Sequence, residues 1–245
     1  MTSPTAVRKR ALVTGASGGI GQAIAERLGR DGAHVIAHAN ANPAAADAVI
    51  ARIRSAGGSA ESIAFDVTDH DAARSACERL LEAGAIQIVV NNAGVHDDAA
   101  FPALREAQWH RVIDVSLNGF FNVTQPLVMP MIRTRWGRIV NLSSVAAIAG
   151  NRGQVNYAAA KGALNSATKA LALELASRGI TVNAVAPGLI AAGMAAQIDP
   201  ALVEKLVPMK RAGSAAEVAA LVAFLASDEA GYISGQVVSI NGAMI

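Results

Sequence analysis

The sequence predicts an α/β fold: one doubly wound domain in which a seven-stranded parallel sheet lies between two layers of helices. Short apolar runs rich in β-branched residues alternate with longer, alanine-rich segments of helical character along the whole chain. The short runs are apolar almost throughout, which is typical of strands covered on both faces. No linker, repeat or low-complexity tract interrupts the 245 residues, so a single domain over 1–245 is expected.

The seven predicted strands lie at 11–14, 34–37, 62–65, 86–90, 138–142, 180–185 and 237–240. The alanine clusters at 44–46 and 158–160 between them are predicted to be helical, because alanine has the highest helix propensity. Periodicity weakens at about 190–212, where glycine and proline recur. That segment is predicted to form a lid over a site at the carboxyl ends of the strands.

Composition narrows the class of protein. Hydrophobic residues make up 52% and charged residues 16%, the formal net charge is +2, and the basic residues are scattered, which argues against a nucleic-acid partner. Arg8, Lys9 and Arg10 precede an apolar run that is too short for a signal peptide or a membrane span. We therefore expect a soluble cytoplasmic protein with no membrane partner. Cys77 is the single cysteine, so no internal disulfide is possible, and its helical setting favours packing; no metal site is expected.

A glycine-rich loop follows the first predicted strand and opens a helix. Gly15, Gly19 and Gly21 have the spacing G-x-x-x-G-x-G, which differs from the commoner G-x-G-x-x-G. Backbone amides and a helix N-terminus in this position can hold a pyrophosphate. Alone, the loop could be only a tight turn. Together with Asn91-Asn92-Ala93-Gly94 after the fourth strand, it favours a dinucleotide site.

The strongest chemical signal is the pair Tyr157 and Lys161. Residues four apart on a helix share one face, so the phenol and the ammonium can act on one substrate atom. A phenol titrates near pH ~10, and the adjacent cation is expected to lower the pKa of Tyr157 and make it a tunable proton donor. Ser144 lies thirteen residues earlier, with Ser143 beside it as a competitor for the same role.

These motifs together resemble the short-chain dehydrogenase/reductase family over nearly the whole chain. The resemblance rests on TGASGGIG at 14–21, DVTD at 66–69, NNAG at 91–94, Ser144, YAAAK at 157–161 and APG at 186–188. It implies a Rossmann fold, usually in a tetramer, that binds NAD or NADP.

The resemblance also implies roles for particular residues. Ser144 would hydrogen-bond a substrate carbonyl oxygen, Tyr157 would donate a proton to it, and Lys161 would lower the pKa of Tyr157 and bind the nicotinamide ribose. The other cofactor contacts implied are Gly15, Ser17, Gly19, Ile20 and Gly21 at the pyrophosphate, Asp66 and Val67 at the adenine, and Asn91, Ala93, Gly94, Pro187, Gly188 and Ile190 along the trough.

The end of the second strand bears on the choice between NAD and NADP. Ala39 stands where NAD enzymes commonly place a carboxylate, so nothing there repels a 2′-phosphate. Asn40 and His38 could donate hydrogen bonds to that phosphate, which favours NADP as NADPH. Gly18, however, stands where many NADP-dependent relatives carry an arginine, and His38 could simply be a polar strand end.

A closer resemblance, to the 3-oxoacyl-[acyl-carrier-protein] reductases, covers 153–157, 176–183, 224–230 and 232–235. It implies an NADPH-dependent reduction of a carrier-linked 3-oxoacyl thioester, in fatty-acid or polyketide/polyene-type synthesis, by a homotetramer. Arg135 and Arg178 match the arginines that dock the acidic carrier protein in those enzymes, although scattered surface arginines are usually only solvated. A dehydrogenase of small alcohols, sugars or steroids is the alternative enzyme.

Two departures from the family pattern favour a further alternative. Ser116 stands where the family has an active-site asparagine, and Asn118, two residues later, would point elsewhere on a helix. Ala192 replaces a threonine that often contacts the cofactor. A serine hydroxyl can still hold a water, though its reach is shorter. The alternative is a catalytically weak NADP-binding subunit that supports a partner.

Overall fold

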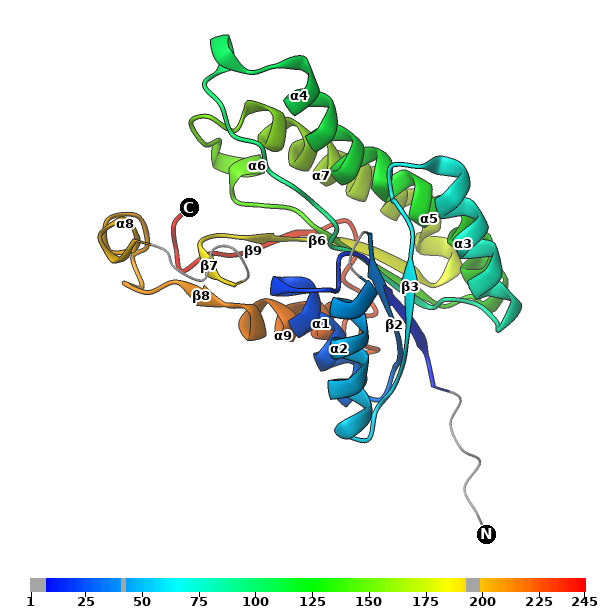
Figure 1. Cartoon of the computed structure of the whole chain (residues 1–245). Helices are drawn as coiled ribbons and strands as arrows, with labels where there is room; N and C mark the ends of the chain where they lie inside the picture. Colours follow the sequence, from blue (N-terminus) through cyan, green and yellow to red (C-terminus); the bar gives the residue numbers. More distant parts are fainter. Residues whose placement is uncertain (1–7, 41–42, 193–198) are drawn as a thin grey trace.

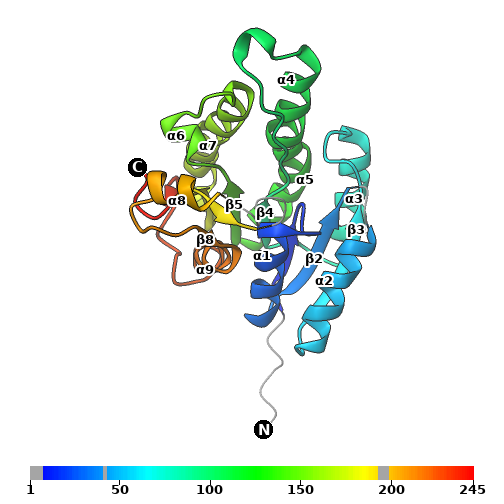
Figure 2. The same ribbon diagram turned by 60° about the vertical axis from the view of Figure 1, so that its left-hand side comes forward.

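A computed structural model describes residues 8–40, 43–192 and 199–245. Its main sheet has seven parallel strands in the order β3-β2-β1-β4-β5-β6-β9 (Figures 1 and 2). Their bounds are β1 (Arg10–Val13), β2 (His34–Ala39), β3 (Ser59–Ala64), β4 (Ile88–Asn91), β5 (Gly137–Leu142), β6 (Ile180–Pro187) and β9 (Val237–Ile240). The predicted α/β fold with a seven-stranded parallel sheet is therefore confirmed.

The strand order reverses between β1 and β4, which are neighbours in the sheet and are followed by chains that leave in opposite directions. At such a point the loops after the two strands separate and leave a crevice at the carboxyl edge, where ligands bind in open α/β sheets. The glycine-rich loop follows β1 and the NNAG segment begins at the end of β4. The topology thus brings together the two motifs that the sequence singled out.

Helices cover both faces of the sheet. α1 (Gly19–Arg30), α2 (Pro43–Ser55) and α9 (Ala215–Leu225) lie on one face, and α3 (His70–Glu82), α5 (Gly119–Thr134) and α7 (Val155–Leu175) lie on the other (Figures 1 and 2). Each layer closes over its own apolar cluster, one around Ile24, Val35 and Val222 and one around Leu12, Leu127 and Ile139. Burial on both faces explains why the central strands are mostly apolar.

The strand that departs furthest from its predicted bounds is β3, which begins at Ser59 instead of residue 62. It is the outermost strand on its side of the sheet, and its side chains alternate between covered and exposed positions. Its first half, Ser59-Ala60-Glu61, is therefore polar, and a search for apolar runs does not find it.

Shorter elements lie mostly near the carboxyl edge. They are the 3₁₀ turn η1 (Phe101–Ala103), the helices α4 (Glu106–Ile113), α6 (Ala146–Ala149) and α8 (Pro200–Leu206), the π-helical turn η2 (Asp114–Asn118), and the strands β7 (Ile190–Ala191) and β8 (Gly213–Ser214). The 3₁₀ turn η3 (Ala176–Arg178) leads into β6 at the amino edge. β7 pairs with β8, so the predicted lid at 190–212 is closed at its base by a two-stranded sheet. Part of that lid, 193–198, lies outside the described residues, and lid motion stays a prediction.

Cys77 packs into the core as predicted. It is fully buried on α3, and burial raises the pKa of its thiol to about 12. None of the described helices is both long and apolar enough to cross a bilayer.

Candidate active site

The glycine-rich loop has the backbone shape of an anion-binding turn. Gly15 and Gly19 have positive φ angles of 62° and 57°, which L side chains rarely adopt. A Cβ on Gly21 would meet the carbonyl oxygen of Gly15, whereas one on Gly18 would meet nothing within 4 Å. Gly18 is the N-cap of α1 and offers no side-chain cap, so the first amides of that helix keep their capacity for a ligand. Ser17 and Ile20 are partly exposed on the same turn.

Asn92 fastens this loop to the end of β4. Its Nδ2 donates hydrogen bonds to the carbonyl oxygens of Thr14 (2.9 Å) and Gly15 (3.0 Å), and the Thr14 hydroxyl accepts from the backbone amides of Asn92 and Ala93. The sequence reasoning placed Asn91, Ala93 and Gly94 in the site and passed over Asn92. Its place inside the NNAG motif was the available signal.

The Asn91 side chain turns into the protein interior, and its place along the trough stays a prediction. Its Nδ2 donates to Thr124 Oγ1 and Asn141 Oδ1, both at 2.9 Å, and Asn141 in turn donates to Thr168 Oγ1 at 2.8 Å. These four polar side chains are buried between the sheet and helices α5 and α7. Asn91 therefore supports the site from beneath, because a buried amide in a parallel sheet must find polar partners.

His38 is not available to a 2′-phosphate, and its predicted hydrogen bond to that group is wrong. The side chain is 1% exposed. Its Nδ1 accepts from the Gly15 amide at 3.1 Å, and its Nε2 lies 2.8 Å from the Phe65 carbonyl oxygen. Asn40, one residue past the end of β2, is exposed at the carboxyl edge and keeps its predicted location.

Asp66 and Val67 follow β3 on the same edge. The Asp66 carboxylate accepts from the amide and the hydroxyl of Thr68, both at 2.8 Å, which forms a local turn. Val67 is buried, and its carbonyl oxygen accepts from Asn122 at 2.9 Å. Both residues therefore lie beside the second strand, where an adenosine end would be expected.

Lys161 is buried on α7 near the carboxyl edge of the sheet. Its side chain is 3% exposed, and Nζ donates to the carbonyl oxygen of Leu142 at 2.7 Å. Burial disfavours the ammonium and lowers the pKa of Lys161 to about 8. A Cβ on Gly94 would lie 3.2 Å from Nζ, so this glycine leaves the room that the ammonium occupies.

Tyr157 and Ser144 come together beside Lys161. The two hydroxyl side chains are hydrogen-bonded, and Lys161 Nζ lies 5.7 Å from the centre of the phenol ring. Ser143, the competitor, is buried and its hydroxyl donates to the Lys161 carbonyl oxygen at 3.4 Å, away from the phenol. Of the two serines, Ser144 is the one placed to act with Tyr157.

The pKa of Tyr157 shifts in the direction opposite to our prediction. Burial raises it, the hydrogen bond with Ser144 lowers it by a smaller amount, and the charge of Asp98 adds a further increase. The ammonium of Lys161 lies against the ring and is bound to a carbonyl oxygen, so it does not offset the loss of solvent around the phenol. The phenol is consequently protonated at neutral pH, the form needed for a proton donor.

Ser116 lies inside the π-helical turn η2. It is 3% exposed, and its Oγ is a buried atom without a hydrogen-bond partner. The turn packs against α7, the helix that carries Tyr157 and Lys161. Asn118 is exposed and donates to Asp114 at 2.8 Å, so it points elsewhere, as predicted. The π-helical turn itself was not predicted.

The end of β6 and the chain after it are joined to β9 and to the segment that follows Ser144. The Gly188 amide donates to the Ile240 carbonyl oxygen at 3.0 Å, and a Cβ there would meet Asn241 and Met244. The Pro187 carbonyl oxygen accepts from the amide of Val145, one residue after Ser144. Ile190 is buried in β7.

Comparison with known proteins identifies this arrangement. The family model described as short chain dehydrogenase matches residues 9–202. The chain belongs to the short-chain dehydrogenase family. Among curated proteins, it is similar to the 3-oxoacyl-[acyl-carrier-protein] reductase FabG of Aggregatibacter actinomycetemcomitans, with 45% identity over 95% of this chain and 98% of the relative. The FabG proteins of Staphylococcus aureus and Pseudomonas aeruginosa are each 42% identical to this chain. Each match spans 96% of this chain, and it spans 98% of the first protein and 97% of the second.

Membership of this dehydrogenase family implies an oxidoreductase with a nicotinamide cofactor. The residues present fit such a cofactor. In the loop after β1, a Cβ at Gly21 would find no room, the space beside Gly18 is open, and the helix N-terminus that follows has no side-chain cap, so its amides can bind a pyrophosphate. Within the part of the chain that the structure describes, no group of three or more His, Cys, Asp or Glu side chains is placed to hold a metal ion.

Asn156 is a buried residue of this dehydrogenase that the sequence reasoning did not single out. Its Nδ2 donates to the carbonyl oxygens of Asp97 (3.0 Å) and Gln108 (3.2 Å), and its Oδ1 accepts from the Tyr157 amide at 2.9 Å. It thus ties the start of α7 to the loop after β4 and to α4. A polar residue directly before Tyr157 was the available signal.

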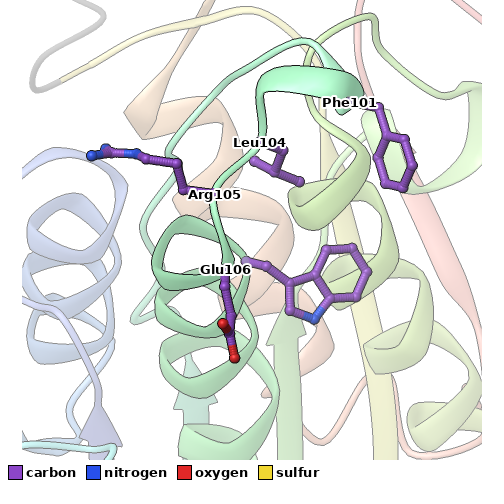
Figure 3. A pocket seen from close by; sticks show the side chains of 5 residues that line it. Phe101, Leu104, Arg105 and Glu106 are labelled. Atoms are coloured by element: carbon purple, nitrogen blue, oxygen red, sulfur yellow. The ribbon is translucent and has the colours of Figure 1, made fainter.

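An apolar depression of about 300 Å³ lies where η1 meets α4 in this dehydrogenase. Phe101, Leu104 and Trp109 supply its apolar surface, and in Figure 3 the Arg105 side chain points away from Phe101. The neighbouring loop is joined to the start of α7 by a hydrogen bond from the Ala99 amide to the Gly153 carbonyl oxygen at 2.9 Å. The low aromatic content gave no indication that two aromatic side chains would line one depression.

Arg135 and Arg178 lie close together, away from the carboxyl edge of the sheet. Arg135 follows α5, Arg178 ends η3, and Arg135 Nη2 donates to the Ser177 carbonyl oxygen at 3.2 Å. Arg135 is two residues before the start of β5 and Arg178 two residues before the start of β6, so they lie at the amino edge of the sheet, opposite Tyr157. Both are exposed.

Proposed function

We propose that this chain is a 3-oxoacyl-[acyl-carrier-protein] reductase that uses NADPH to convert a 3-oxoacyl thioester into the 3-hydroxyacyl thioester. The observation that carries the proposal is the meeting of Ser144, Tyr157 and Lys161 at the carboxyl edge, beside a loop shaped for a pyrophosphate. The relatives from three bacteria, similar over nearly the full length, support the choice of substrate.

The side chains divide the work on the substrate. Tyr157 keeps its proton at neutral pH and donates it to the carbonyl oxygen, and Ser144 donates a hydrogen bond that holds the same oxygen. Lys161, fixed by the Leu142 carbonyl oxygen, provides positive charge next to the ring of Tyr157 as the phenolate forms. A bound reduced nicotinamide supplies the hydride.

The hydroxyl of Ser116 can hold a water between η2 and α7, because it is a buried donor and acceptor without a protein partner. We include it in the site on that ground. The remaining cofactor contacts are proposed at Gly15, Ser17, Gly19, Ile20, Gly21, Asp66, Val67, Ala93, Gly94, Pro187, Gly188 and Ile190.

Preference for NADPH rests on the end of β2. Ala39 is buried there and has no charge to repel a 2′-phosphate, and the exposed Asn40 can donate to one. Both ring nitrogens of His38 are hydrogen-bonded, to Gly15 and to Phe65, so His38 cannot contact the 2′-phosphate. The preference for NADPH therefore depends on Asn40 alone among the two polar side chains.

Carrier docking is proposed at Arg135 and Arg178. Since both lie at the edge opposite Tyr157, a carrier bound there cannot serve the catalytic group of the same chain directly. We therefore propose a homotetramer in which the arginines of one copy serve the site of a neighbour. The proposed location is the cytoplasm. Exchanging both for glutamate is expected to raise KM for the carrier-linked substrate about tenfold and to leave a coenzyme-A-linked substrate unchanged.

The test follows the loss of NADPH absorbance with acetoacetyl thioesters of acyl carrier protein and of coenzyme A, and with free ketones. We expect turnover of the thioesters, greatest with the carrier, and loss of turnover with retained NADPH binding in Tyr157→Phe. Faster turnover of free ketones would favour a dehydrogenase of alcohols, sugars or steroids. Absence of turnover by folded, NADPH-saturated protein would favour a binding subunit.

A further inference from the structure

His38 has no part in the reaction described above, yet it is the most completely enclosed histidine of the chain. It lies on β2 with 1% of its surface exposed, and its ring packs on Phe65 with the ring centres 4.2 Å apart. Both ring nitrogens face backbone groups: the Gly15 amide at Nδ1 and the Phe65 carbonyl oxygen at Nε2. The ring thus joins the glycine-rich loop to the segment that follows β3.

These two contacts fix the state of the imidazole. An amide can only donate, so Nδ1 must be the unprotonated acceptor, and a carbonyl oxygen can only accept, so Nε2 must carry the hydrogen. Only one neutral tautomer satisfies both neighbours. A second proton on Nδ1 would set two donors against each other at 3.1 Å and remove the acceptor of the Gly15 amide.

Gly15 is held from both sides by side chains. His38 accepts from its amide, while Asn92 donates to its carbonyl oxygen at 3.0 Å. The next residue is bound to the same strand, because the Ala16 amide donates to the His38 carbonyl oxygen at 2.8 Å. Gly15 has a φ of 62°, and a Cβ there would lie 3.1 Å from atoms of Asn92 and Ala93, so the loop packs closely on the segment after β4 at this residue. Loss of the His38 acceptor would therefore free the first turn of the loop.

We propose that His38 is a positioning residue for the cofactor loop, and that protonation of its ring weakens nucleotide binding by releasing the Gly15 amide. The inference rests on the proposed use of the loop to hold the cofactor pyrophosphate. It gives the protein a nucleotide affinity that falls in acid through one identified side chain.

The charges around the ring set the direction of the effect. Asp66 faces His38 from the segment after β3, and the loop on the other side, 14–18, carries no charged side chain. Burial lowers the pKa of His38 below its ordinary value of 6.5, and the Phe65 carbonyl oxygen and Asp66 offset part of this. The neutral ring is thus retained at pH 6.5 and above, and the support for Gly15 is lost only as the pH falls through the lowered pKa, which lies below 6.5.

The experiment measures the Kd of NADPH and of NADH by fluorescence titration from pH 8 down to the lowest pH at which circular dichroism still shows the native fold. NADH is included because the 2′-phosphate of NADPH titrates in the same range. For wild type we expect Kd to rise roughly tenfold as the pH falls through the lowered pKa of His38, the factor that one hydrogen bond of ordinary strength contributes. His38→Asn keeps an acceptor that does not titrate, and its Kd should vary much less.

Two further variants complete the test. His34→Asn is the matched control, because His34 lies on the same strand but is bound to Ser59 and Glu61 at the opposite edge; it should follow wild type. His38→Leu removes the acceptor and should bind roughly tenfold more weakly than His38→Asn already at pH 8.

Some outcomes would overturn the proposal. A wild-type Kd that does not change down to the lowest pH at which the fold is native, an equal pH response in His38→Asn, or no nucleotide binding at pH 8 would each do so. Failure of the proposed substrate is distinguishable, because nucleotide binding and its pH response would persist in a protein that reduces no thioester.

Discussion

Replacing Lys161 with methionine should stabilise the fold while abolishing activity. The ammonium is 3% exposed, and burial lowers its pKa from 10.5 to about 8. That difference corresponds to about 3 kcal/mol of unfavourable free energy at neutral pH, where the unfolded chain carries the same charge in water. Methionine has similar length and no charge, but it leaves the Leu142 carbonyl oxygen without its donor, at a cost of about 1–2 kcal/mol.

The net expectation is a gain of about 1–2 kcal/mol at pH 7, or a rise in Tm of about 2–8 °C for a chain of this size. The pH dependence is the sharper signature. Between pH 8 and 10.5 the unfolded chain binds more protons at this lysine than the native state does, so wild-type stability rises with pH there. The advantage of the variant should therefore shrink across that interval.

Thermal unfolding followed by circular dichroism at pH 7 and pH 9.5, without nucleotide, checks this. Lys169→Met is the matched control, because Lys169 is exposed on the same helix and its replacement should leave Tm nearly unchanged. A Lys161→Met protein that melts below wild type at pH 7, or whose advantage does not depend on pH, would refute the reasoning.

Three other outcomes are expected. Ser144→Ala should lower kcat about 100-fold or more, because it removes the hydroxyl bound to the substrate oxygen, whereas Ser143→Ala should change kcat only a few-fold; steady-state kinetics with an acetoacetyl thioester compares them. Gly21→Ala should raise the Kd of NADPH about tenfold or more in fluorescence titrations, since its Cβ meets the loop backbone, while Gly18→Ala, with open space, should bind nearly as wild type. Cys77 should resist a thiol reagent at pH 8 in the native protein and react on unfolding, because burial raises its pKa to about 12.

The fold could be predicted because its strands are buried on both faces. Runs such as 138–142 and 180–185 are mostly apolar and rich in β-branched residues, and the structure places strands there. The edge strand β3 shows where that reasoning ends, since only alternate residues are covered and its polar first half carries no apolar signal. The π-helical turn around Ser116 also escaped prediction, because its sequence continues the helical pattern on both sides.

The candidate site could be predicted in its residues but not in all of its electrostatics. Spacing placed Tyr157 and Lys161 on one helical face, and the structure agrees. Whether the neighbouring charge or the loss of solvent controls the pKa of Tyr157 depends on where Nζ lies, and that follows from the carbonyl oxygen of Leu142, which no motif indicates. His38 was misassigned for the same reason, because a sequence does not reveal that a polar strand end turns inward.

The buried series of Asn91, Asn141 and Thr168 has a consequence for how this scaffold tolerates redesign. Thr168 follows Lys161 by two helical turns on the same side of α7, and its hydroxyl accepts from Asn141 in the middle of the sheet. A slide of α7 along its axis by even one residue would leave amides and hydroxyls unpaired in an apolar interior. Aliphatic replacements of similar volume are expected to preserve the melting temperature but to remove the free-energy cost of such a slide. Turnover should therefore fall in these variants while the melting temperature stays nearly unchanged.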